Sequence, residues 1–419
     1  MAFQQGLSGL NAAAKALDVI SNNVANGSTV GYKLAGAQFG DVFAAALNGA
    51  AAGVQIGIGT SMSQVSQQFT QGNITPTNNP LDVAINGDGF FIVQSPDATV
   101  TNYSRNGQFD IDANGFIVNA SGYKLMGFLP GGGSTTASAI QLSASNSSLT
   151  GAPAATTAMN IGINLDSRNT TPTLTPFDYT NTSTYNSSTA STAYDSLGNP
   201  HAVTMYFVRS ASAPSLAGAS SRWDVYTSID NGAPSATPGN MEFSSAGSLI
   251  GTSAVGTYTF NSSFPVTTGA TTPLAFTLNM AGSTQYGSTF NVTSQTQDGY
   301  APGTLSGITI SKDGIVQGRY SNGQTTDIAT IALATFASPN GLLSVGSNFW
   351  AESAESGAAQ LGAPGIGKRG LLQAGAVEES NVDLTAELVN MITQQRNYQA
   401  NAQSIKTQDQ VMQTLVNLR

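Results

Sequence analysis

The segment FQQGLSGLNAAAKALDVISNNV, residues 3–24, sets the architecture of the amino-terminal end. Its apolar residues recur at alternating steps of four and three, with Ser21 at the one intervening polar position. A heptad stripe of this kind is typical of a helix that packs along a second helix. We expect the helix to end at Asn26-Gly27, because Gly readily takes the left-handed conformation that follows many helices. The stripe consists of Phe3, Leu7, Leu10, Ala14, Leu17 and Val24.

The carboxyl-terminal end repeats this rhythm over a longer segment, residues 384–416. Gln395 and Asp409 fill the two polar positions of its stripe. The tetrapeptide at 380–383, Ser-Asn-Val-Asp, fits a capping box and predicts where the helix begins. Acidic residues crowd that start, which suits the helix dipole. The stripe consists of Leu384, Leu388, Met391, Tyr398, Ala402, Ile405, Met412 and Val416.

Between the two helices, the sequence has the pattern of β-strands. Residues 82–85 and 90–93 flank Asn-Gly-Asp-Gly, which predicts a hairpin. Short alternating strands surround Asn114-Gly115, and others lie at 202–208 and 223–226. We therefore predict an α+β fold, in which terminal α-helices form a coiled-coil-like core domain and nested, mainly antiparallel β domains lie between them.

The helical patterns lie at the two ends of the chain, one β region lies between them, and a second β region lies inside the first. We therefore expect stacked domains with both termini at one end. Two Gly/Ala-rich stretches separate the helices from the β regions and have the pattern of connectors. The predicted boundaries are 1–27 and 376–419 for the terminal helical core domain, 28–72 and 350–375 for the connector, 73–145 and 286–349 for an inner β domain, and 146–285 for an outer β domain.

Composition excludes several classes of function. The chain has 419 residues and a net charge of −9, with only 9% charged residues and no Lys/Arg run, so we expect no nucleic-acid partner. It has no cysteine, which removes thiol catalysis, disulfides and thiolate metal sites. No run approaches the roughly 18 apolar residues of a membrane span. The amino terminus lacks the features of a secretory signal, so we expect either a cytoplasmic protein or export without cleavage.

Two motifs resemble ligand sites but lack essential residues. Residues 110–115 copy the start of a calcium-binding loop, yet the twelfth position is Ser121 rather than Glu, and a hairpin turn accounts for the segment. Residues 362–369 approach a phosphate-binding loop, but Arg369 stands where a Ser or Thr must hold Mg²⁺. A flexible connector explains that segment better. We expect neither a metal nor a cofactor.

His201 is the only histidine in the chain. A histidine acting as a general base needs a group to activate and another to orient it. The surrounding residues, 195–201, indicate a turn that enters a strand. We therefore assign no catalytic residue, and the sequence offers no acid/base pair at a recognisable spacing.

The helical stripes have two possible explanations. An amphipathic helix usually packs on the core of its own domain. The polar positions of the carboxyl-terminal helix are rich in amides rather than charges, however, and amides suit a crowded environment because burying them costs less than burying charges. Both helices also lie at the ends of the chain, away from the β regions. We favour packing between molecules, through the stripe residues of both helices.

The same residues resemble the bacterial flagellar axial proteins, the family of rod and hook subunits. The amino-terminal resemblance lies in Ser8-Gly-Leu-Asn11, Ser21-Asn-Asn-Val-Ala-Asn26 and Gly31-Tyr32-Lys33. Its carboxyl-terminal counterpart lies in Ser380-Asn-Val-Asp383-Leu and Gln395-Arg-Asn-Tyr398-Gln. The interior segments Leu81-Asp-Val-Ala-Ile-Asn, Tyr103-Ser-Arg-Asn-Gly-Gln-Phe109 and 193–201 are similar to hook subunits in particular.

The resemblance implies a structural subunit that self-assembles into a curved, flexible tube, the hook, which joins rod to filament and transmits motor torque as a universal joint. In that family the terminal helices form the inner tube and the β domains form outer shells. The implied partners are other copies of the chain, the distal rod, the hook cap, the hook–filament junction proteins and the flagellar type III export apparatus. Export without a cleaved signal would place the protein outside the cell.

Two alternatives remain open at this point. A rigid distal-rod subunit shares the terminal signatures, although rod members lack a large outer domain. A secreted β-rich adhesin would share the acidic, cysteine-free, Asn/Thr/Gly-rich composition. An adhesin should carry a signal peptide and a membrane anchor, and the sequence shows neither.

Overall fold

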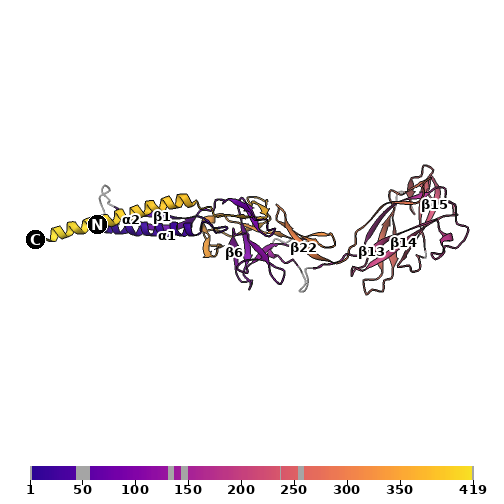
Figure 1. Ribbon diagram of the computed structural model, residues 1–419, viewed down its shortest axis with the longest axis horizontal. Helices are drawn as coiled ribbons and strands as arrows, with labels where there is room; N and C mark the ends of the chain where they lie inside the picture. Colours follow the sequence, from indigo (N-terminus) through magenta and orange to yellow (C-terminus); the bar gives the residue numbers. More distant parts are fainter. Residues whose placement is uncertain are drawn as a thin grey trace. The chain divides into compact units, whose positions relative to one another are not determined.

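The computed structural model describes residues 2–43, 57–130, 136–142, 150–235, 237–252 and 259–417. The chain divides into two compact units (Figure 1). The terminal unit comprises residues 1–149, 306–319 and 325–419, and the inserted unit comprises residues 150–305 and 320–324. Terminal helices with many antiparallel strands between them confirm the predicted α+β class.

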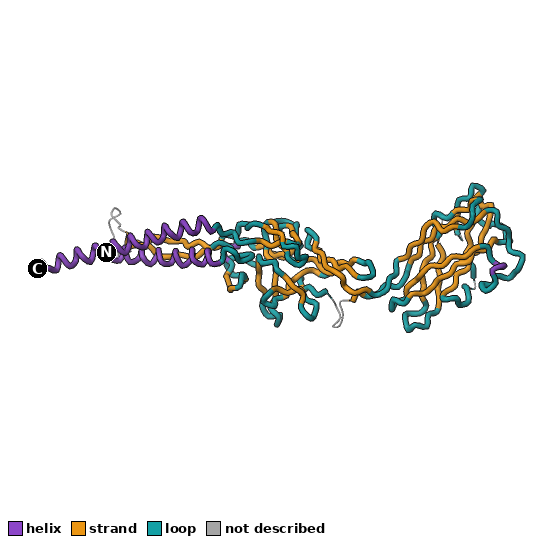
Figure 2. The backbone as a smooth tube through the Cα atoms, in the orientation of Figure 1, coloured by secondary structure: helices purple, strands orange, loops and turns teal. Residues whose placement is uncertain are grey.

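The terminal unit carries the two long helices, α1 (Ala2–Ala25) and α2 (Leu384–Asn417). They lie side by side and run in opposite directions, since Gly6 faces Ile405 at one end and Gly27 faces Leu384 at the other (Figure 2). The Asp383 carboxylate accepts hydrogen bonds from the backbone N–H of Thr385, at 2.9 Å, and caps α2. The sequence predicted a capping box that begins at Ser380. The structure places the capping residue three positions later, at Asp383, so this prediction is wrong.

The end of α1 also differs from expectation. Gly27 is not among the described glycines with positive φ. A Cβ at this position would lie 2.5 Å from the Leu384 side chain, so the absence of a side chain allows the helices to approach. The glycine is explained by close packing rather than by a left-handed helix end.

A hairpin follows α1 in the segment predicted as the first connector. Strands β1 (Ala35–Phe43) and β2 (Gly57–Gln67) pair antiparallel, with Ala35 opposite Gln67, and both pack on α1. The segment is thus a packed structural element, which its Gly/Ala-rich composition did not indicate. The domain boundaries proposed from the sequence stay predictions.

The rest of the terminal unit is built from short strands. The predicted hairpin at 86–89 is wrong, because β4 (Val83–Asn86) pairs with β29 (Leu371–Ala374) while β5 (Phe90–Gln94) joins another sheet. Gly87 and Gly89 have φ of 114° and 131°, outside the values of a tight type I′ turn. The hairpin around Asn114-Gly115 is confirmed by the pairing of Ile111 with Ile117.

These strands enclose an aromatic core. Phe90 and Trp350 meet edge to face at 5.6 Å, and Phe69, which follows the β1–β2 hairpin, contacts both. The remaining strands of the unit are β3 (Ile74–Pro76), β6 (Thr101–Ser104), β7 (Phe109–Ile111), β8 (Ile117–Asn119), β9 (Lys124–Phe128), β10 (Ser138–Ala139), β23 (Ile315–Tyr320), β24 (Thr325–Ile331), β25 (Leu333–Thr335), β26 (Leu343–Gly346), β27 (Phe349–Ala351), β28 (Gln360–Gly362) and β30 (Ala376–Glu378), with a 3₁₀ turn at Pro339–Gly341.

The inserted unit contains two five-stranded sheets around one core. In β12 (Ala158–Asp166) and β14 (Pro200–Arg209) apolar side chains alternate along the strand and reach a core that includes Trp223 and Phe243. One sheet has the order β18-β19-β12-β20 with β21 also on β12, and the other runs from β13 to β17 in order. The other strands of these two sheets are β13 (Ser187–Tyr194), β15 (Ala219–Ile229), β16 (Gly239–Ser244), β17 (Leu249–Gly251), β18 (Thr259–Phe264), β19 (Leu274–Asn279), β20 (Thr284–Tyr286) and β21 (Asn291–Gln297), with a 3₁₀ turn at Thr182–Thr184. Strands β11 (Thr150–Gly151) and β22 (Gly303–Ile310) instead belong to the sheet that contains β23 and β24.

Candidate assembly surface

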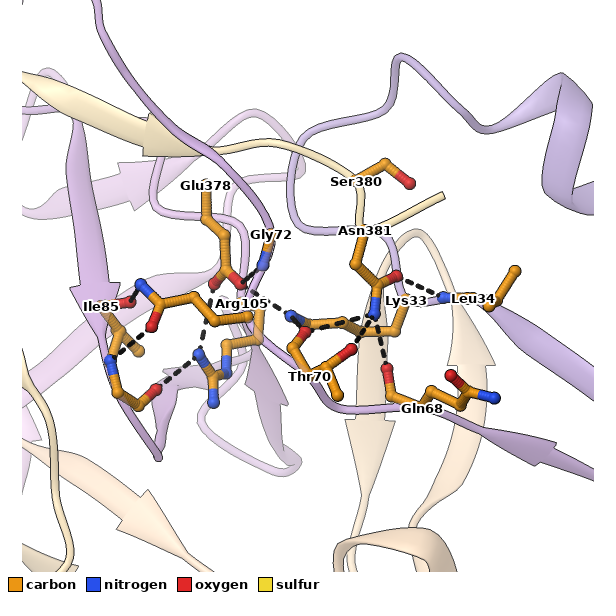
Figure 3. A network of polar contacts seen from close by, with 12 residues as sticks. Lys33, Leu34, Gln68, Thr70, Gly72, Ile85, Arg105, Glu378, Ser380 and Asn381 are labelled. Carbon is orange, nitrogen blue, oxygen red and sulfur yellow. Dashed lines mark hydrogen bonds and ion pairs between the residues drawn. The ribbon is translucent and has the colours of Figure 1, made fainter. Parts of the chain in front are cut away.

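A buried ionic cluster fixes both helices to the strands of the terminal unit (Figure 3). The Glu378 carboxylate accepts from Lys33 Nζ at 2.7 Å and from Arg105 Nη1 at 3.2 Å. The side chains of Lys33 and Glu378 are fully buried and that of Arg105 nearly so. Burial lowers the pKa of Lys33, and the charge of Glu378 opposes this effect. The cluster joins the segment after α1, the strand before α2 and the segment after β6.

Backbone groups complete the cluster. The N–H of Gly72 donates to Glu378 at 2.9 Å, and the carbonyl of Thr70 accepts from Lys33 at 2.7 Å. Asn381 accepts from the N–H of Leu34 at 2.7 Å and donates to the carbonyl of Gln68 at 2.9 Å. The chain just before α2 is thus tied to both ends of the hairpin (Figure 3). These hydrogen bonds hold the segment that leads into α2 against the segments around the hairpin.

A second buried contact links the helices directly. Asn23 of α1 donates to the Glu387 carboxylate of α2 at 3.0 Å and also donates to the carbonyl of Ala35 at 2.8 Å. Tyr32 donates its hydroxyl proton to Asn23 at 3.0 Å. Burial and the nearby Glu387 raise the pKa of Tyr32. Asn23 therefore joins α1, α2 and the hairpin at one point.

Between residues 6 and 16, the buried face of α1 consists of small residues. Gly6, Ala13 and Ala16 are buried, and a Cβ added to Gly9 would lie 2.9 Å from Asn401. These residues recur at steps of three and four, and each of them directly precedes a residue of the apolar stripe in the sequence. The two helices therefore approach through small side chains, and the bulky stripe is turned by about 100° from the contact.

The predicted stripe residues consequently have mixed surroundings within one chain. Of the set, Ile405 contacts Gly6 and Leu384 contacts Gly27. Leu7 and Leu388 are 45% and 48% exposed. Phe3, Leu384, Tyr398 and Met412 are also exposed, whereas Leu10, Ala14, Leu17, Val24, Met391, Ala402 and Ile405 are partly buried, and the side chain of Val416 lies outside the described residues.

The structure gives ordinary roles to the three motifs that resemble chemical sites. The Asp112 carboxylate accepts from the N–H groups of Asn114 and Phe116, as in a hairpin turn. Gly365 and Gly367 form turns with positive φ beside β28. His201 lies at the start of β14 between two carboxylates, 2.6 Å from Asp230 and 3.3 Å from Asp195. Within the described ranges, no group of three or more His, Cys, Asp or Glu could hold a metal ion.

Sequence reasoning missed the small-residue face and the ionic cluster. The face has a signal of its own, since Gly6, Gly9, Ala13 and Ala16 follow a heptad spacing. The cluster has no local signal, because Lys33, Arg105 and Glu378 are far apart in the chain. Among the described helices, none is long and apolar enough to cross a lipid bilayer.

Four family models match successive parts of this chain. They are the "Flagella basal body rod protein" model at residues 3–33, the "Flagellar hook protein FlgE/F/G D1 domain" at 84–167, the "Flagellar basal body protein FlaE D2 domain" at 164–300 and the "Flagellar basal body rod FlgEFG protein C-terminal" at 373–418. The matches cover both helices and both units, and they define the class as flagellar rod and hook proteins.

Full-length relatives narrow this class. The chain is 42% identical to the flagellar hook protein FlgE of Escherichia coli and 32% identical to that of Brucella suis, over 100% of this chain and 100% and 98% of those proteins. A crystal structure of Helicobacter pylori FlgE2 shares the fold, with a TM-score of 0.50 and 15% identity over 73% of this chain and 100% of that one. The chain belongs to the flagellar hook protein family. It is therefore a structural subunit of the flagellum rather than an adhesin, and it associates with other flagellar components.

Proposed function

We propose that this subunit polymerises through α1 and α2 into a curved tube that joins rod to filament and transmits torque while it bends. The exposed apolar side chains of the two helices carry this proposal. Leu7 and Leu388 are about half exposed in the single chain. Fully burying a Leu side chain is worth about 1.5–3 kcal/mol, so several such residues along two helices favour contact with further copies.

The inserted unit suits contacts that break and reform. Hydrogen bonds of Ser, Thr and Asn side chains exchange with water for a net of about 0.5–1.5 kcal/mol each. The unit holds many such residues and, between Lys124 and Lys312, the chain contains no lysine. Such contacts between neighbouring copies would permit small sliding movements, while the helices hold the tube together.

The further partners follow from the family and not from the geometry. We propose that the subunit contacts the distal rod, the hook cap, the hook–filament junction proteins and the flagellar type III export apparatus, and that it works outside the cell after export without signal cleavage. The relatives are named as hook proteins, and we propose that this chain likewise has no catalytic activity.

Single charges on the stripe test the proposal. Leu7→Asp and Leu388→Asp should each abolish tubes, because a carboxylate in an apolar contact between copies costs several kcal/mol unless it is neutralised or paired. Thermal unfolding of the monomeric subunit should change little, since both side chains are half exposed. Sedimentation and electron microscopy report assembly.

Gln4→Glu is the matched control, because it adds a negative charge at an exposed polar position of the same helix. This variant should assemble as the unmodified protein does. Tubes formed by both Leu variants would show that the stripe does not hold the polymer together. A lower unfolding temperature with intact tubes would favour packing of the helices on their own unit.

A further inference from the structure

A groove runs between the hairpin and the two helices of the terminal unit. It consists of two adjoining hollows of about 300 and 410 Å³, which share Phe39 of β1 and Gln394 of α2. Small side chains of α1, including Ala12 and Ala16, form its floor. We call this the hairpin groove, lined by Gly9, Ala12, Ala16, Phe39, Gln394 and Asn397.

The carboxyl-terminal end of α2 extends past the start of α1. Gly6 lies opposite Ile405 and Gly27 lies opposite Leu384. Because the helices are antiparallel, residues of α1 and α2 whose numbers add up to 411 lie at the same level along the helix pair. Ala2, the first residue of α1, is thus level with residue 409. Residues 410–417, which we call the overhang, continue beyond it (Figure 2). Among the described residues, no helix lies beside them.

The overhang carries apolar side chains that no described part of the terminal unit covers. Val411 and Met412 are 54% and 61% exposed. The neighbouring Gln410 and Gln413 supply amides, and the groove presents amides of its own at Gln394 and Asn397. Methionine is unbranched and flexible, so it can adapt to an irregular space.

Charge does not oppose such a contact. The one carboxylate that lines the hairpin groove, Glu387, already accepts a hydrogen bond from Asn23. The carboxylate next to the overhang, Asp409, accepts from Gln413 at 3.1 Å. Docking of the overhang in the groove would therefore bury small, apolar and amide groups without leaving a charge unpaired.

We propose that the overhang of one copy occupies the hairpin groove of a neighbouring copy, an inference that rests on polymerisation through the terminal helices. With both copies in the same direction, Met412 of one reaches Ala12 of the next. Ala12 is level with residue 399, thirteen residues from Met412, so the copies are offset by about 20 Å at 1.5 Å per residue. Each copy offers one groove and one overhang, so the contact repeats along the polymer.

Disulfide trapping tests this contact, since the chain contains no cysteine of its own. The double variant Ala12→Cys/Met412→Cys, assembled into tubes and mildly oxidised, should give a ladder of covalent oligomers on a denaturing gel. A disulfide forms only when the two Cα atoms approach within about 7 Å. A second pair, Asn397→Cys/Met412→Cys, uses the exposed lip of the same groove and should also give a ladder.

The matched control is Asp18→Cys/Met412→Cys. Asp18 follows Ala16 by two residues, about 200° around α1, and its side chain is exposed. This variant should assemble and remain monomeric on the denaturing gel. A ladder from the control alone, or no ladder from either groove pair in well-formed tubes, would overturn the docking and leave polymerisation intact. Absence of tubes from the unmodified protein would instead overturn the proposed function, and the docking with it.

Discussion

Glu378 is the residue that balances the charges beneath the helices. Its carboxylate forms ion pairs with Lys33 and Arg105, and all three side chains are almost completely buried. We predict that Glu378→Ala destabilises the terminal unit by about 3–5 kcal/mol, because it leaves two buried cations without their partner. Urea unfolding followed by Trp350 fluorescence measures this in the full chain, after Trp223→Phe removes the only other tryptophan.

The adjacent residue supplies the control. Glu379 is exposed, and among the described residues its carboxylate accepts from the hydroxyl of Thr75, at 3.2 Å. Glu379→Ala should therefore change the unfolding free energy by less than about 1 kcal/mol. Equal losses from the two variants would mean that the cluster contributes no more than an exposed carboxylate does.

His201 gives the inserted unit a dependence on pH. Burial disfavours its charged form, but hydrogen bonds to Asp230 and Asp195 outweigh this effect and raise the pKa of His201. Because the folded pKa lies above the unfolded value of about 6.5, the added stability is fully present below that pH. It is lost as the pH rises through the folded pKa. We predict that the urea midpoint of the inserted unit falls over this range.

The single histidine and the two tryptophans make this measurable. NMR titration of the only imidazole gives its pKa in the folded chain, and Trp350→Phe leaves Trp223 to report unfolding of the inserted unit. His201→Gln should remove the pH dependence above 6.5. An imidazole pKa at or below 6.5 in the folded chain would contradict the prediction.

At the scale of elements, the contact between α1 and α2 depends on the size of the residues at Gly6 and Gly9. A Cβ at Gly6 would lie 2.9 Å from Cγ1 of Ile405, a flexible side chain. We predict that Gly6→Ala still forms tubes, because a shift of the Ile405 side chain can relieve this close contact. Gly6→Leu should prevent assembly, since the larger side chain separates the helices. Electron microscopy of the assembled protein distinguishes the two.

Gln4→Leu is the control for added apolar bulk, because Gln4 is exposed on the same helix. It should assemble. If Gly6→Leu formed normal tubes, the small-residue face would not determine how closely the helices approach in the polymer.

The sequence predicted elements with strong periodicity better than their partners. Both helices and the hairpin at Asn114-Gly115 follow from local patterns, and the structure contains them. The pairing of β4 with β29 joins residues almost 300 positions apart, so no local pattern could reveal it. Leu7 and Leu388 of the stripe are about half exposed in the single chain, so the contact with further copies inferred from their periodicity stays a prediction.

At the scale of the whole molecule, the two units should be separable. The chain enters and leaves the inserted sandwich at adjacent points, where the Asp298 carboxylate accepts from the N–H groups of Thr157 and Ala158 at 2.8 and 3.0 Å. We predict that replacing residues 158–297 by a short Gly/Ser linker leaves a subunit that folds and still forms tubes. Their curvature should be reduced or altered, because the proposed contacts between inserted units are lost.

Electron microscopy of the shortened protein gives both assembly and curvature. A linker of the same composition inserted between Thr157 and Ala158, with the sandwich retained, controls for the linker itself. Loss of tubes after the deletion alone would show that the inserted unit helps to hold the polymer together, contrary to the proposed division of roles.

The adjacent entry and exit of the inserted sandwich also bear on how such proteins change over evolution. A domain whose two ends meet can be lengthened, exchanged or removed by a single genetic event, while the reading frame on both sides continues into the same helices. In the proposed tube the inserted unit would be free to diversify under selection from the surroundings of the cell, whereas every change in the helices would have to suit all copies at once. A foreign domain with closely spaced termini, grafted between Thr157 and Asp298, would by the same logic be displayed in a regular array.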